Sequence, residues 1–195
     1  MKSVYSELKP NITLTPDENT QYIFIVKDGS SYSADIELNL KKEGLSCELS
    51  VLGRIGKNVS VTIKTTANHL VAGTSCVTNY RIILDEQASS DYTGKIIIRK
   101  KASQTNSYLD NKTLVMGEKT KNTTRPILEI ENDDVKASHG STTGRVGEAE
   151  TFYLTSRGLA RSEAENLIAE GFFENIVAKI LDPDVREKVR ADVKS

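Results

Sequence analysis

One of the two histidines of the chain, His139, has neighbours that would suit a metal ligand. Gly140 follows it directly and Gly144 lies close by, and glycines let the backbone bend or approach another chain closely. A neutral imidazole is a common metal ligand, and a neighbouring carboxylate can fix its second nitrogen. Taken alone, these residues favour a histidine that is hydrogen-bonded for structural reasons, with the ligand role as the alternative.

The two cysteines do not form a recognisable metal site. Cys47 alternates with polar residues in step with Leu49 and Val51, so it is expected to be a small core residue. Cys76 follows His69 in a strand-like segment, but no zinc-type ligand spacing is present. A joint metal role for His69 and Cys76 is therefore only a weak alternative.

Carboxylates gather at Glu129, Glu131, Asp133 and Asp134. Paired carboxylates can act as general acid and base in glycosidases, and such groups can also bind Ca²⁺. A polysaccharide-active β-solenoid enzyme is therefore one alternative function. The simpler interpretation is a solvated strand face followed by a turn, with Arg125 pairing with the acids.

Three blocks of sequence carry a resemblance to a known family. They are Arg125–Ile130 (RPILEI), Asp133–Gly144 (DDVKASHGSTTG) and Phe152–Gly158 (FYLTSRG). In this order they resemble the C-terminal signature of the SufB/SufD family, the scaffold proteins of SUF iron–sulfur cluster assembly. The resemblance implies a right-handed parallel β-helix core and a scaffold function without catalysis.

The resemblance also implies a role for His139 at an interface. In the SufD half of the family, a histidine at this position lies near the SufB–SufD interface and is implicated in building the cluster. Ser138-His139-Gly140 is the SufD-like version, although Ala137 stands where many SufD members have a cysteine. Clusters need about four ligands, mostly thiolates. We therefore expect no stably bound cofactor on the isolated chain and a transient iron–sulfur cluster only in a complex.

A long series of strands must position these residues. From about residue 20 to 135, apolar and polar residues alternate with the period of two that is typical of half-buried strands. Ile36, Val59 and Ile82 lie about 23 residues apart, a spacing that suits a solenoid with two strands per coil. The same pattern suits an antiparallel meander or a β-sandwich interaction module without metal chemistry. The family resemblance favours the solenoid.

The pattern changes near residue 147, which predicts a β-helix core over residues 1–147 and a helical region over 148–195. A helix over Glu148–Ser156 should end at Gly158. Ser162 is a candidate N-cap for the next helix, with Glu165 closing a capping box. Asp182 and Pro183 should begin the last helix.

Partner binding is expected at both parts of the chain. The resemblance implies that the β-helix pairs with a SufB-like chain or with a second copy as a dimer. It also implies that the C-terminal helices dock SufC, an ABC-type ATPase. An amphipathic helix binds a groove through anchors spaced by three or four residues, and Phe172, Phe173 and Ile176 are the candidate anchors.

Composition excludes several other functions. With 26 basic and 27 acidic residues the net charge is −1, which gives no electrostatic footprint for nucleic acid or an anionic membrane. The longest apolar run, residues 22–26, is too short to span a bilayer, and no signal peptide is apparent. The sequence therefore predicts a soluble, cytoplasmic protein. No phosphate-binding loop or nucleophile elbow indicates a self-sufficient enzyme.

Overall fold

The computed structural model describes residues 1–27 and 29–193. Its strands form two parallel sheets, one of odd-numbered and one of even-numbered strands, here called the odd sheet and the even sheet. The odd sheet contains β1 (Lys2–Glu7), β3 (Thr20–Val26), β5 (Ser46–Ile55), β7 (Ser75–Leu84), β9 (Thr105–Val115) and β11 (Val135–Arg145). The even sheet contains β2 (Asn11–Leu14), β4 (Tyr32–Leu40), β6 (Ser60–His69), β8 (Ser89–Ile98) and β10 (Lys121–Ile130).

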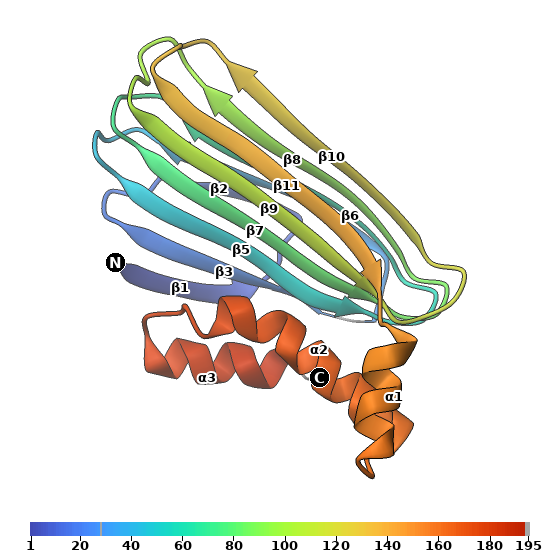
Figure 1. The fold of residues 1–195 in the computed structure, drawn as a ribbon. Coiled ribbons are helices and arrows are strands. Elements are labelled where there is room, and N and C mark those ends of the chain that lie inside the picture. Colours follow the sequence, from blue (N-terminus) through green and yellow to red (C-terminus); the bar gives the residue numbers. More distant parts are fainter. Residues whose placement is uncertain (28, 194–195) are drawn as a thin grey trace.

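Successive strands alternate between the two sheets, so each coil adds one strand to each sheet (Figure 1). Every neighbouring pair is parallel, which confirms the predicted β-solenoid and excludes the antiparallel meander or sandwich. The predicted strand series was incomplete, because β1, β2 and β11 lie outside it. β11 was missed because its alternating positions carry few apolar side chains.

The predicted coil length was wrong. Cys47 pairs with Cys76, which pairs in turn with Ser107, so successive coils take 29 and 31 residues. The expected spacing of about 23 compared Ile36 with Val59, which lies in a corner and not on the strand beside β4. Each coil is longer because it contains two strands of about ten residues and two corners.

The corners between strands repeat a left-handed backbone conformation, which the sequence indicates through the residue types found there. Asn58 and Gln87 have φ values of 63° and 58° at one corner, and Gly44 and Gly73 have 72° and 69° at the other. Most residues avoid this left-handed region, which glycine and asparagine enter most readily. The Gly44–Gly73 interval therefore reports the true length of a coil.

Between the sheets lies a core of aliphatic side chains from every coil, including Ile36, Leu38, Leu49, Val51 and Ile63. Each strand directs alternate residues into this interior, so the period-two pattern becomes a stack of apolar layers. Between β7 and β8, the rings of Tyr80 and Tyr92 stack with centroids 3.9 Å apart. Their hydroxyls bond to Ser90 and Thr65, so neither is unsatisfied.

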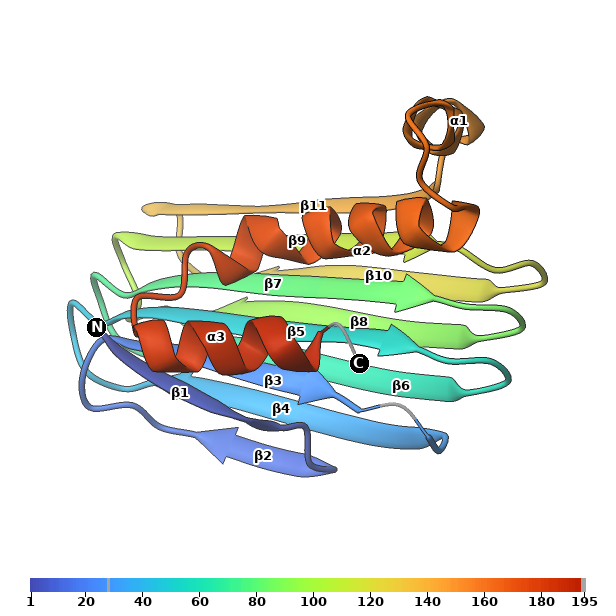
Figure 2. The same ribbon diagram turned by 90° about the horizontal axis from the view of Figure 1, so that it is seen from below.

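In the described part of the chain, three helices follow the last strand: α1 (Glu148–Ser156), α2 (Arg161–Val177) and α3 (Pro183–Asp192). Figure 2 shows α2 and α3 along the outer face of the odd sheet, with α1 standing away from it. Outward-facing residues of the sheet, Ile23, Leu52 and Ile83, form a second buried cluster with Phe173 and Ile176 of α2. The helices thus cover part of a sheet face that would otherwise expose apolar side chains.

Two of the three predicted helix boundaries are confirmed. Gly158 follows α1 with a φ of 96°, and the Asp182 side chain accepts hydrogen bonds from the first turn of α3. The predicted cap at Ser162 was wrong, because α2 begins one residue earlier, at Arg161. The Ala160 amide donates to Glu163 at 2.8 Å, so Glu163 takes the role expected of Glu165.

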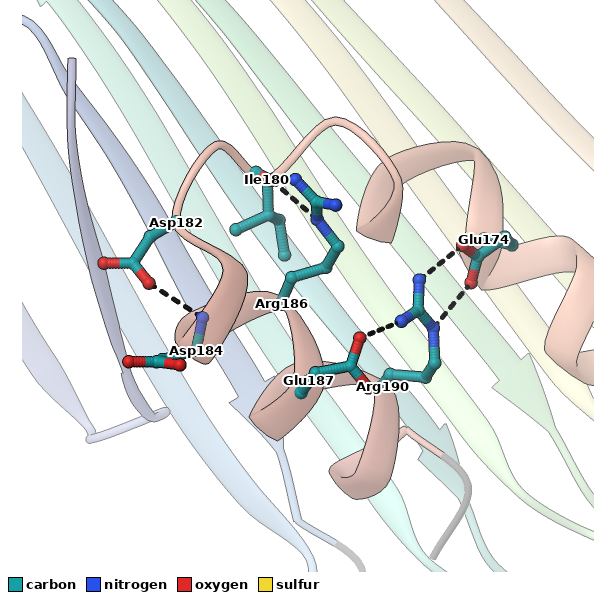
Figure 3. A network of polar contacts seen from close by, with 7 residues as sticks. All are labelled: Glu174, Ile180, Asp182, Asp184, Arg186, Glu187 and Arg190. Atoms are coloured by element: carbon teal, nitrogen blue, oxygen red, sulfur yellow. Dashed lines mark hydrogen bonds and ion pairs between the residues drawn. The ribbon is translucent and has the colours of Figure 1, made fainter.

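Polar contacts fasten α3 to its surroundings (Figure 3). Arg190 pairs with Glu174 of α2 at 2.7 Å and with Glu187, while Arg186 donates to the carbonyl of Ile180. At the far end of the helix, the Tyr5 hydroxyl of β1 donates to Asp192. The last helix is therefore attached to the first strand.

The turn between α2 and α3 is also fixed to the sheet. Gln21 of β3 donates to the carbonyl of Lys179 and accepts from the amide of Leu181, both at 3.1 Å. A single side chain thus satisfies two backbone groups that the helix end leaves open.

Candidate functional site

His139 lies on β11, the last strand of the odd sheet, and is exposed. It pairs in register with Leu109 of β9, which is buried in the core. Because in-register residues of parallel strands face the same side, His139 faces the space between the two sheets. It does so at the end of the solenoid, where no further described coil covers it.

We call this surface the open end. It consists of the inward-facing residues of the last coil: Asn122, Thr124, Pro126, Leu128 and Ile130 of β10, with Val135, Ala137, His139, Ser141 and Thr143 of β11. The effect of lacking a cover is clear at Ile130, which is 43% exposed, whereas its neighbour Ile98 is fully buried. β10 and β11 are also the terminal strands of their sheets, and such edges are templates for pairing with another chain.

The thiols do not lie at the open end. Cys47 and Cys76 occupy neighbouring coils in the buried core, which confirms the core role predicted for Cys47. Burial raises the pKa of the Cys76 thiol to about 12 and also raises that of Cys47, so both are protonated at neutral pH. Among the described residues, no group of three histidine, cysteine or acidic side chains could hold a metal ion.

His69 is a structural histidine. It is fully buried, with Nδ1 2.8 Å from the Thr74 hydroxyl and Nε2 3.0 Å from the Ser107 hydroxyl. Burial lowers its pKa to about 4, so the ring is neutral at physiological pH. Both nitrogens are occupied, which leaves His139 as the histidine available for a ligand role.

The two glutamates of the acidic cluster pair with cations of the neighbouring coil. Glu129 lies 2.6 Å from Lys95 and 3.3 Å from Arg99, and Glu131 lies 2.7 Å from Arg99. The hydrogen bond from Lys95 is the main cause of the lowered pKa of Glu129, whereas a catalytic general acid needs a raised one. Arg125 pairs with Asp91 and not with these acids. The lowered pKa of Glu129 therefore argues against this residue as the general acid of a polysaccharide-active enzyme.

Gly140 lies beside a tyrosine side chain of the adjacent strand. A Cβ atom at this position would lie 2.8 Å from the hydroxyl oxygen of Tyr108, on the outer face of the odd sheet. Glycine therefore makes room for a tyrosine of the adjacent strand, while Gly144 has no neighbour within 4 Å of such an atom. Tyr108 could not be linked to Gly140 from the sequence, because only the coil register brings these two residues together.

The three candidate docking residues do not form a free surface. Phe173 and Ile176 are buried against the odd sheet, and Phe172 is half-buried, with its ring edge-on to Phe173 at a centroid distance of 5.5 Å. Phe173 and Ile176 are therefore not exposed to a partner, because they already attach α2 to the sheet, while docking through Phe172 stays a prediction.

Other apolar residues of the helices are exposed. Phe152 and Tyr153 of α1 are 73% and 57% exposed, and Leu167 of α2 is 49% exposed. Arg157 lies over the Tyr153 ring, 5.2 Å from its centroid. The sequence signal was the Phe152–Tyr153 pair itself, since adjacent helical residues do not lie on the same face of a helix.

None of the described helices is both long and apolar enough to cross a membrane. The family model of the SUF system FeS cluster assembly SufBD core domain matches residues 11–172. An iron–sulfur cluster assembly SufBD family protein of Mycobacterium tuberculosis is 38% identical over 107 residues, which cover 54% of this chain and 27% of the relative.

Two further relatives represent both named halves of the family. The iron–sulfur cluster assembly protein SufD of Escherichia coli is 32% identical over 114 residues, covering 58% of this chain and 27% of that protein. The iron–sulfur cluster assembly protein SufB of Bacillus subtilis is 33% identical over 106 residues, covering 54% and 23%. The chain thus spans about a quarter of the length of these relatives. With a parallel β-solenoid and a family match that covers most of its residues, the chain belongs to the SufBD family of SUF iron–sulfur cluster assembly proteins.

Proposed function

We propose that the chain is a SufD-like scaffold or accessory protein that contributes His139 to cluster assembly across an interface. The observation that carries this proposal is the position of His139: it is exposed, it faces inward at the open end, and the thiols are buried elsewhere. A cluster at this site would take its remaining ligands from a partner. The Ser138-His139-Gly140 motif supports the SufD-like assignment.

The pairing partner would be a SufB-like chain or a second copy of this one. The edges of β10 and β11 can each accept another strand, and such strand addition provides main-chain hydrogen bonds along the whole edge. A partner placed there would also cover the exposed apolar part of the open end. In this proposal the protein is cytoplasmic and non-enzymatic, and holds a cluster only transiently.

Anaerobic reconstitution with iron and sulfide tests the role of His139. The isolated chain should stay colourless, and a cluster absorbance should appear when a SufB-type partner is added. His139→Ala should reduce that absorbance while the complex, followed by light scattering, persists. His69→Ala is the matched control: it should lower thermal stability because His69 is buried. A stoichiometric cluster on the isolated chain, or full reconstitution with His139→Ala, would contradict the proposal.

We further propose that α1 docks an ABC-type ATPase of the SufC kind. Phe152 and Tyr153 support this because they are exposed on a helix that stands away from the sheet (Figure 1). Phe152→Glu should weaken binding of the ATPase in calorimetry without changing the melting temperature. Leu181→Glu is the control, since Leu181 is 58% exposed but lies in the turn between α2 and α3. Equal binding by both variants and the wild type would exclude α1 as the docking site.

A further inference from the structure

A ring of polar side chains lies inside the last two coils, directly beside the row of His139. The Asn111 amide donates to the Ser141 hydroxyl at 3.2 Å, which lies 3.0 Å from the Thr124 hydroxyl. Asn122 donates to the Thr143 hydroxyl at 2.8 Å, and Thr143 pairs in register with Thr113. The amide–hydroxyl ring therefore comprises Asn111, Thr113, Asn122, Thr124, Ser141 and Thr143.

Three oxygens of this ring are buried and have no hydrogen-bond partner among the described residues: Oδ1 of Asn111, Oγ1 of Thr113 and Oδ1 of Asn122. Asn111 and Thr113 are 1% and 2% exposed. The amide nitrogens of both asparagines are already used as donors, so their free atoms are acceptors. A buried acceptor without a donor is strongly unfavourable, so each of these oxygens favours a donor or a cation beside it.

We propose that the amide–hydroxyl ring is a binding site for a small guest that offers protons or positive charge to oxygen, namely a monovalent cation or an ordered water. All the ring oxygens are neutral, so they do not favour an anion such as hydrosulfide. A buried water typically makes about three hydrogen bonds, and Na⁺ or K⁺ also binds neutral oxygens, so either guest could use oxygens of this ring.

The ring is closed on one side and accessible on the other. Tyr80 and Ile82, the neighbours of Asn111 and Thr113 on β7, are fully buried and form its floor. Ser141 and Thr143 are exposed at the open end, so a small guest can enter from there. A partner that covered the open end would enclose the guest.

The direction in which a single substitution shifts the melting temperature tests the proposal. Thr113→Val keeps the shape of the side chain and removes its hydroxyl. If a guest uses this oxygen, the melting temperature should fall by roughly 2–4 °C; if the ring is empty, removing an unpaired hydroxyl should raise it. Thr65→Val is the control, because the Thr65 hydroxyl is bonded to Tyr92 at 2.7 Å and its loss should lower the melting temperature in either case.

Salt identity distinguishes the two guests. Wild type and Thr113→Val are melted in NaCl, KCl and choline chloride at equal ionic strength. A higher melting temperature in Na⁺ or K⁺ than in choline, lost in Thr113→Val, identifies a cation. Equal values in all three salts, with Thr113→Val less stable, identify water. A Thr113→Val protein that is more stable than the wild type in both NaCl and KCl overturns the proposal.

Discussion

Protonation of His69 should make the fold sensitive to mild acid. The ring is buried between the Thr74 and Ser107 hydroxyls, and its pKa is about 4 in the folded protein against an ordinary value of 6.5. Because the unfolded chain binds the proton more tightly, stability is complete above pH 6.5 and is lost as the pH falls toward 4. Linkage between these two pKa values predicts a loss of about 2 kcal/mol at pH 5 and about 3 kcal/mol once the pH is below 4.

Urea unfolding between pH 7.5 and pH 5 measures this loss. The measurement stops at pH 5 because Glu86 and Glu129 would also lose stabilising interactions in stronger acid. The pKa values of both carboxyl groups are lowered by lysine partners. His69→Gln should be less stable at pH 7.5 but should lose most of the dependence on pH. His139→Gln, at an exposed site, should keep the pH dependence of the wild type. A His69→Gln protein with the same pH slope as the wild type would refute the assignment.

The remaining predictions concern packing, the glycine of the signature and a helix cap. Phe173→Ala should destabilise the protein by about 3–5 kcal/mol in urea unfolding, because the ring is 1% exposed in the cluster under α2; a change below about 1 kcal/mol would show that α2 is not packed there. Gly140→Ala should lower the melting temperature because its methyl group meets the Tyr108 hydroxyl, and the loss should be smaller in a Tyr108→Phe background; equal losses would exclude this contact. Asp182→Ala should cost about 1 kcal/mol by removing the cap of α3, and unchanged unfolding would mean that the cap contributes nothing.

The sequence predicted the strands well where apolar residues alternate with polar residues. In a segment such as Ile36–Leu40, the alternation can be recognised from adjacent residues alone. The structure places the apolar residues of this segment in the buried core. The same rule failed at β11 because the last coil has no cover, so its inward-facing positions need no large apolar side chains. The segment that carries His139 was recognised through its signature and not through its strand pattern.

Contacts between coils could not be read from the sequence. The bonds of His69 reach Ser107, 38 residues away, and depend on a coil length that the apolar spacing misjudged. Helical periodicity likewise identified the apolar stripe of α2 but not the surface that it meets. Phe173 and Ile176 were therefore taken as partner anchors, although the outer face of the chain's own odd sheet occupies them.

The attachment of α3 to β1 changes how the solenoid should respond to stress. In a simple array of coils each unit contacts only its neighbours, so the ends can fray independently. Here α2 and α3 return from the last coil to the first, where the Asp192–Tyr5 bond and the Gln21 contacts hold them. The helices therefore connect the two ends of the solenoid. A force applied at α1 is shared by coils at both ends, and opening one end requires the helices to detach from the other.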